Sequence, residues 1–82
     1  MSAFDQYEEI ALAMAQSTIM AAIDRSPLSQ SGVAKRLGIN RSFITKVLRG
    51  NHNLTIKTMA RICAAAGCEL RFGVVPSREP RP

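Results

Sequence analysis

Apolar residues near the start of the chain recur every three or four positions, which is the spacing of one face of an α-helix. The pattern predicts a long helix over residues 5–24, which Pro27 ends. One apolar strip of this helix should face the core, and a second strip either widens the core face or meets a partner. The core strip consists of Leu12, Ala15, Ile19, Ala22 and Ile23, and the second strip of Tyr7, Ile10, Met14 and Ala21.

Three later segments begin with one shared arrangement: an apolar residue, a polar N-cap and another apolar residue at the fourth helical position. This is the hydrophobic staple, and it predicts helices over residues 30–37, 41–49 and 56–66. A glycine follows each of them, where a left-handed C-terminal residue is favoured. The staples are Leu28, Ser29 and Val33; Ile39, Asn40 and Ile44; and Leu54, Thr55 and Met59.

After the last predicted helix the apolar period changes to strict alternation, which predicts a short β-strand over residues 68–75. A single strand has no hydrogen-bonding partner in an otherwise helical chain. We therefore expect it to pair with the same strand of a second copy, the alternative being an extended tail packed within the monomer. Residues 76–82 include three prolines and should be disordered. The expected dimer interface consists of Cys68, Leu70, Phe72 and Val74.

These elements make a mainly α-helical chain of four to five helices, which fits one domain over residues 1–75. Hydrophobic residues make up 46% of the 82 residues and charged ones 21%, which is typical of a folded globular protein. No apolar run approaches the roughly 20 residues of a membrane span. The first residues carry acids and lack the layout of a signal peptide. We therefore expect a cytoplasmic protein with no membrane partner.

Charge is distributed unevenly along the chain. The formal net charge is +5, yet no acidic residue lies between Asp24 and Glu69. A basic block without internal neutralisation attracts polyanions and gains affinity for nucleic acid by releasing counterions. The block contains Arg25, Lys35, Arg36, Arg41, Lys46, Arg49, Lys57 and Arg61.

The residues that enzymes and metal sites need are scarce. Cys63 and Cys68 have a spacing that matches neither a zinc knuckle nor a redox motif. We interpret both as packing residues, with a redox-sensing thiol pair as the alternative. His52 is the sole histidine and has no carboxylate or second metal ligand near it in the sequence. We therefore expect no enzyme, no metal ion and no cofactor.

Residues 30–50 satisfy the physical requirements of a helix-turn-helix. Ala34 is small where the two helices cross, and Gly38 permits the turn between them. On a helical wheel, one side of the second helix is apolar and the other carries hydrogen-bond donors, which fit the acceptor groups of base edges. The polar side consists of Arg41, Ser42, Thr45, Lys46 and Arg49.

The segment LSQSGVAKRLGINRSFITKVLRG closely resembles the helix-turn-helix of the lambda-repressor and Cro type, the XRE family, and the resemblance extends from Leu28 to about Leu70. The following LTIKTMARICAAAGCELRF resembles the HipB-like antitoxin subgroup, in which a terminal strand pairs across the dimer. The family resemblance implies that Gln30 binds a phosphate and that Arg49 and Asn51 touch the DNA backbone. It implies base contacts by Arg41, Ser42, Thr45 and Lys46.

Two further positions extend the motif. Phe43 departs from the small or hydroxyl residue that many relatives carry at this place, and it either packs on the first motif helix or touches a thymine methyl group. The N-terminal amides of the helix that follows the motif form an anion site. Asn53, Thr55 and Lys57 are therefore expected to contact DNA phosphates.

The sequence predicts a homodimeric repressor, bacterial or phage-encoded and acting at the nucleoid, that binds a palindromic operator of double-stranded DNA through the major groove. The alternative is an antitoxin, in which the same dimer binds a toxin protein and represses the operon that encodes both. RNA binding is disfavoured because the aromatic residues that would stack on single-stranded bases are scattered.

Overall fold

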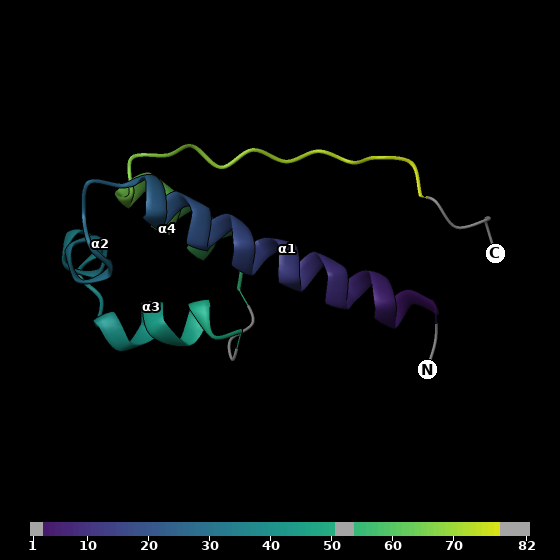
Figure 1. Cartoon of the computed structure of the whole chain (residues 1–82), viewed down its shortest axis with the longest axis horizontal. Helices are drawn as coiled ribbons and strands as arrows, with labels where there is room; N and C mark the ends of the chain where they lie inside the picture. The colour runs from purple at the N-terminus through teal and green to yellow at the C-terminus, as the bar shows by residue number, and fades with distance from the viewer. Residues whose placement is uncertain (1–2, 51–53, 78–82) are drawn as a thin grey trace.

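The computed structural model describes residues 3–50 and 54–77. Within them lie four helices, α1 (Ala3–Arg25), α2 (Gln30–Leu37), α3 (Arg41–Leu48) and α4 (Ile56–Ala65). Figure 1 shows α2, α3 and α4 gathered at the C-terminal end of α1, whose N-terminal half projects beyond them. Residues 68–77, called the tail below, run back alongside α1. The predicted mainly helical class is confirmed, and no described helix is long and apolar enough to cross a membrane.

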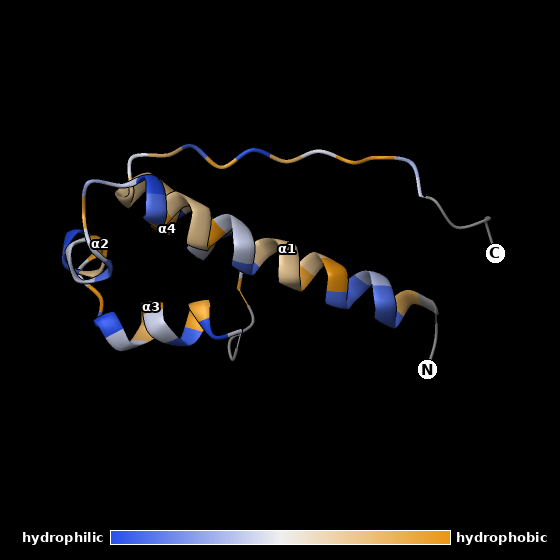
Figure 2. Ribbon diagram, in the orientation of Figure 1, coloured by the Kyte–Doolittle hydropathy of each residue, from blue (hydrophilic) through white to orange (hydrophobic). Residues whose placement is uncertain are grey.

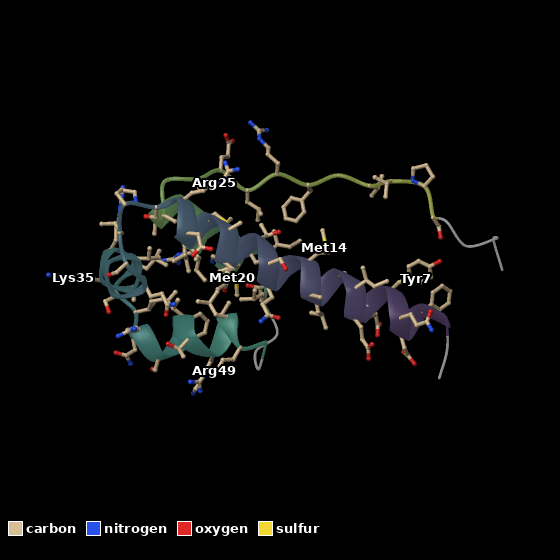
Figure 3. The ribbon with its side chains drawn as sticks, viewed as in Figure 1. Tyr7, Met14, Met20, Arg25, Lys35 and Arg49 are labelled. Atoms are coloured by element: carbon tan, nitrogen blue, oxygen red, sulfur yellow. The ribbon has the colours of Figure 1, made fainter. Side chains whose placement is uncertain are left out.

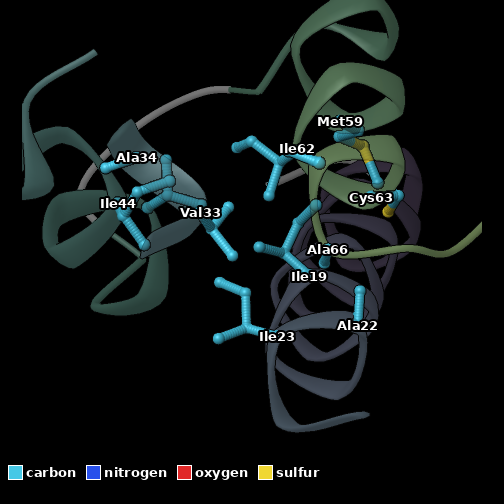
Figure 4. Packing of buried hydrophobic residues seen from close by; sticks show 12 residues of the cluster. Ile19, Ala22, Ile23, Val33, Ala34, Ile44, Met59, Ile62, Cys63 and Ala66 are labelled. Atoms are coloured by element: carbon cyan, nitrogen blue, oxygen red, sulfur yellow. The ribbon is translucent and has the colours of Figure 1, made fainter. Parts of the chain in front are cut away.

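One apolar cluster joins the four helices. The side chains of Ile19, Ile44 and Ile62 are fully buried within it and come from α1, α3 and α4. Figure 4 shows Val33 of α2 directed into the same cluster. Among the described residues no polar or charged side chain is buried. Because burial of apolar surface is the main favourable term in folding, this cluster fixes the position of α2 and α3 on α1.

The two apolar strips of α1 have different surroundings. Along the core strip, Ile19, Ala22 and Ile23 are buried as predicted. Leu12 is 51% exposed, contrary to the prediction, because it precedes the buried part of α1 and does not join the core cluster. The second strip does not widen the core face, since its members are exposed to solvent. They are Tyr7, Ile10, Met14 and Ala21.

The predicted helix starts are confirmed, and two of the three have the expected capping bond. The backbone is extended at each predicted N-cap. Ser29 Oγ accepts a hydrogen bond from a first-turn N–H of α2 at 3.2 Å, and Thr55 Oγ1 accepts one in α4 at 3.1 Å. Asn40 makes no such side-chain bond, so α3 relies on packing for its position. The ends of α3 and α4 each come one residue before the predicted position.

The tail is extended, as the alternation predicts, but it forms no strand within the described residues. From residue 69 to residue 76 no main-chain hydrogen bond joins it to another described residue. A strand needs a ladder partner, and the single chain offers none. Leu70 is half-buried against the core, whereas Phe72 is 67% and Val74 99% exposed, and Figure 2 shows apolar and polar residues alternating along the tail. Residues 78–82 of the predicted disordered segment lie outside the described residues.

Candidate nucleic-acid interface

The two helices of the motif are held at a fixed angle by the turn between them. Gly38 has φ of 72°, in the left-handed region that side chains with a Cβ rarely adopt. The N–H of Ile39 donates to the carbonyl of Ala34 at 3.0 Å, which closes the end of α2. Ala34 is buried where the helices meet, as predicted. The predicted role of Gly38 as the left-handed turn residue between the two helices is confirmed.

The helix α3 has one buried and one exposed side. Ile44 and Val47 are 0% and 1% exposed and attach the helix to the core. Of the predicted base-contacting residues, Arg41, Ser42 and Lys46 are exposed, and Arg49 follows them at the end of the helix. Figure 3 shows the side chain of Arg49 directed away from the other helices. The structure therefore brings these polar side chains together on one outward surface.

Thr45 differs from its neighbours on this surface. It is half-buried, and its hydroxyl Oγ1 donates a hydrogen bond to the carbonyl of Arg41 at 3.2 Å. A hydroxyl has one proton and two lone pairs. Because the proton is engaged within α3, Thr45 in this arrangement can meet a ligand only as a hydrogen-bond acceptor.

Phe43 lies on the flank of α3. Its ring is half-buried and packs against the core cluster, which confirms the packing interpretation. It also borders a hollow of about 660 Å³ between α3 and α4. Lys46 and Arg61 line the same hollow from opposite helices. The cationic surface thus continues from α3 onto α4, and Arg61 joins the candidate contacts although the motif alone did not indicate it. Its place in the acid-free block was the available signal.

One cation of the basic block has a partner within the chain. Arg36 Nη1 donates to the carbonyl of Ala65 at 3.5 Å, so this cation lies against the C-terminal end of α4, where helix carbonyls favour positive charge. The side chains of five other cations of the block form no ion pair and no hydrogen bond with any described residue. Their donors are therefore available to a ligand. They are Arg41, Lys46, Arg49, Lys57 and Arg61.

Two predicted phosphate contacts lie at helix N-termini. Gln30 is the first residue of α2 and is half-buried, and Lys57 is exposed in the first turn of α4. Thr55 caps α4, and its hydroxyl lies 2.9 Å from the hydroxyl of Thr58. N-terminal amides and a nearby cation favour an anion at such a position. Asn51, His52 and Asn53, predicted to join α3 to α4, lie outside the described residues.

A polar contact that the sequence pattern did not indicate holds the end of α3. Gln16 of α1 donates a hydrogen bond from Nε2 to the carbonyl of Leu48 in α3. Gly50 follows with φ of 78°, and a Cβ at this position would lie 3.0 Å from the Gln16 side-chain oxygen. Gln16 therefore positions α3 relative to α1. The one feature of the sequence that could have indicated this contact is the polar Gln16 beside apolar residues of α1.

The cysteines occupy packing positions. Cys63 is buried in the core cluster, and Cys68 is half-buried beside it, with its N–H donating to the Cys63 carbonyl at 2.8 Å. Burial, together with the nearby Cys68, raises the pKa of the Cys63 thiol above its ordinary value. A raised pKa lowers the thiolate fraction and hence the reactivity. Within residues 3–50 and 54–77, no group of acids, histidines and cysteines is arranged to hold a metal ion.

Comparison with known proteins agrees with this geometry. A family model described as helix-turn-helix matches residues 19–72, which include the end of α1, all of α2, α3 and α4 and the start of the tail. No curated protein and no solved structure matches the chain. The match covers well over half of the chain and includes every residue of the outward surface of α3. The chain therefore belongs to the helix-turn-helix family of the Cro/C1 type, and it is a DNA-binding transcription regulator.

Proposed function

We propose that two copies of the chain bind one palindromic operator and repress transcription by covering a promoter. The observation that carries this proposal is the outward surface of α3. Its hydrogen-bond donors are exposed and have no acidic residue near them in the sequence, and the opposite side of the helix is buried in the core. Two α3 helices in successive major grooves would be about 34 Å apart. Such a repressor acts in the cytoplasm on bacterial or phage DNA.

The first turns of α3 would make the base contacts. Arg41 is the first residue of the helix, and this end enters the groove most directly in proteins of this kind. Arginine and lysine donate to the O6 and N7 acceptors of guanine, whereas hydroxyls discriminate less between bases. We therefore assign sequence preference mainly to Arg41 and Lys46. Ser42 and Thr45 supply the weaker contacts.

Phosphate contacts would fix the register of α3 on the duplex without reading sequence. Gln30 and Lys57 lie at the N-termini of α2 and α4, and Arg49 at the C-terminal end of α3. Thr55 contributes the cap of α4. Asn51 and Asn53 stay predictions because they lie outside the described residues.

Dimerisation would use the tail, in which Cys68, Leu70, Phe72 and Val74 share one face of the alternating segment. The unpaired main chain of residues 69–76 supports pairing with the same segment of a second copy. Antiparallel pairing of two identical segments has the two-fold symmetry that a palindrome requires.

Replacing Lys57 by alanine should weaken binding to every duplex by about the same factor. A phosphate contact carries no sequence information, and losing one reduces the slope of log affinity against log salt by about 0.9. Fluorescence anisotropy titrations at several salt concentrations, on operator and scrambled duplexes, measure both quantities. Arg25→Ala is the matched control, because Arg25 is an exposed cation in the last turn of α1, to which no DNA contact is assigned. An unchanged salt slope for Lys57→Ala would remove this residue from the interface.

A second candidate function is that of an antitoxin that also represses its own operon. The exposed apolar side chains of α1 favour it, because they offer a surface for another protein. The discriminating observation is an adjacent reading frame whose product co-purifies with this chain. Absence of such a product would leave the repressor alone.

A further inference from the structure

A groove that the proposed repression does not use lies between the middle of α1 and the start of the tail, with Leu54 and Met59 at its base. Its volume is about 790 Å³, and its walls include Met14 from α1 and Phe72 from the tail. Figure 3 shows Met14 and Tyr7 on the side of α1 that faces the tail. Closer to the N-terminus of α1, outside the groove, the hydroxyl of Tyr7 lies 2.8 Å from that of Ser77. A polar contact therefore joins α1 to the tail beyond the groove.

We propose that the N-terminal half of α1 in a second copy of this chain occupies this groove, in addition to the pairing of the two tails. The dimer would then contain two antiparallel α1 helices beneath a two-stranded ribbon. This inference rests on the proposed homodimer and extends it, because it assigns the interface to α1 as well as to the tail.

The exposed apolar area has the size that such an interface needs. Six large apolar side chains of the projecting half of α1 and of the tail, in and beside the groove, are between 44% and 99% exposed. At roughly 150 Å² for a fully exposed large side chain they present on the order of 600 Å². Each partner in a standard interface contributes about 800 Å² in total, so these side chains supply most of it before main-chain and polar atoms are added. They are Phe4, Tyr7, Ile10, Met14, Phe72 and Val74.

The main chain of the tail favours a second copy as the occupant. Residues 69–76 have no main-chain partner within the described chain, and α1 cannot provide one because its own backbone groups are bonded within the helix. An identical tail supplies an extended segment of equal length and the same alternation. Pairing it in antiparallel register brings the two α1 helices to the same side of the ribbon.

Charge and position agree with this occupant. Asp5, Glu8 and Glu9 lie on the projecting half of α1, which carries no basic residue, so DNA would be repelled from it. Arg71 lines the groove opposite Glu8 and would meet the acidic α1 end of a second copy. Figure 1 shows the projecting half of α1 at the end of the molecule away from α2 and α3. A dimer joined there leaves both α3 helices free for one duplex.

The test is the double variant Ile10→Glu and Met14→Glu in the full chain, with Met20→Glu as matched control. Met14 lines the groove and Ile10 lies one helical turn before it, whereas Met20 is 43% exposed farther along the same helix and outside the groove. Sedimentation equilibrium measures the dimer dissociation constant, and circular dichroism measures helix content. We expect the double variant to raise this constant by more than about 100-fold, because unpaired carboxylates would be buried in the dimer. The control should leave it within about threefold of the wild type, as expected for a surface substitution away from an interface.

A third variant, Val74→Pro, tests tail pairing separately from the α1 contact. Proline has no main-chain N–H, so it weakens the pairing of the tails without changing α1. If Val74→Pro dissociates the dimer while the double variant stays dimeric, the tails pair but α1 does not enter the groove, and the inference is overturned. If the double variant stays dimeric and the wild-type chain binds the product of a neighbouring gene, the groove is assigned to that protein, and the inference is likewise overturned. A wild-type chain that is monomeric at operator-binding concentrations would overturn both the inference and the proposed homodimer.

Discussion

Replacement of Ile62 by alanine is expected to lower the free energy of unfolding by about 3 kcal/mol, within the usual range of roughly 2 to 5 kcal/mol for a buried aliphatic residue. Ile62 is fully buried in α4, at the cluster where α4 meets α1 and α2. Its removal leaves a cavity that the surrounding helices fill only in part. Urea unfolding followed by circular dichroism measures the change.

Ile56→Ala is the matched control for this experiment. It removes the same atoms from the same helix, but Ile56 is 65% exposed, so little apolar surface is lost from the core. We expect a change within about 0.5 kcal/mol. Both variants are compared at one protein concentration, because dimerisation makes apparent stability depend on concentration. Equal losses for the two variants would show that the cluster does not determine the fold.

The second large effect is expected at Arg41. Arg41→Ala should reduce affinity for the operator by about 1 to 3 kcal/mol, that is by roughly 5-fold to 150-fold, and should relax the preference at one base pair. Affinity for a scrambled duplex should change much less, because base contacts contribute little to nonspecific binding. Titrations of both duplexes at one salt concentration measure the two losses.

Arg25→Ala again serves as the control, since it removes the same charge from the C-terminal end of α1. It should change operator affinity by less than about threefold once dimerisation is complete, because a screened charge distant from the duplex contributes little. Similar losses for Arg41→Ala on operator and scrambled DNA would assign Arg41 to the phosphate backbone. That result would transfer base recognition to Lys46 and Ser42.

The local features of the fold were the most predictable. Each staple places two apolar residues one turn apart around a polar cap, so Ser29 and Thr55 indicated the helix starts from sequence alone. Gly38 was predictable for the same reason, because its left-handed backbone is a local requirement of the turn. Such features depend on neighbours within four residues, which the sequence shows directly.

Features that depend on distant segments were harder to predict. Arg36 belongs to the basic block in sequence, but folding places it against the C-terminal end of α4. Gln16 supports α3 from a position 32 residues away. The segment 68–75 is extended but unpaired in the single chain, because alternation specifies an extended segment but cannot supply its partner, and the predicted strand pairing with a second copy stays a prediction. The outward surface of α3 shows both kinds of feature. The spacing of its polar residues could be predicted from the helix sequence alone, whereas the half-burial of Thr45 depends on packing with other elements.

The central claim is that two copies read one palindromic operator through α3. Selection of bound sequences from random duplexes tests it most directly, since it reports sequence, symmetry and spacing together. We predict enrichment of a palindrome whose half-sites are centred about 10 base pairs apart, and loss of one base preference in each half-site for Arg41→Ala. Recovery of a single unsymmetrical element, or of no preferred sequence, would contradict the claim.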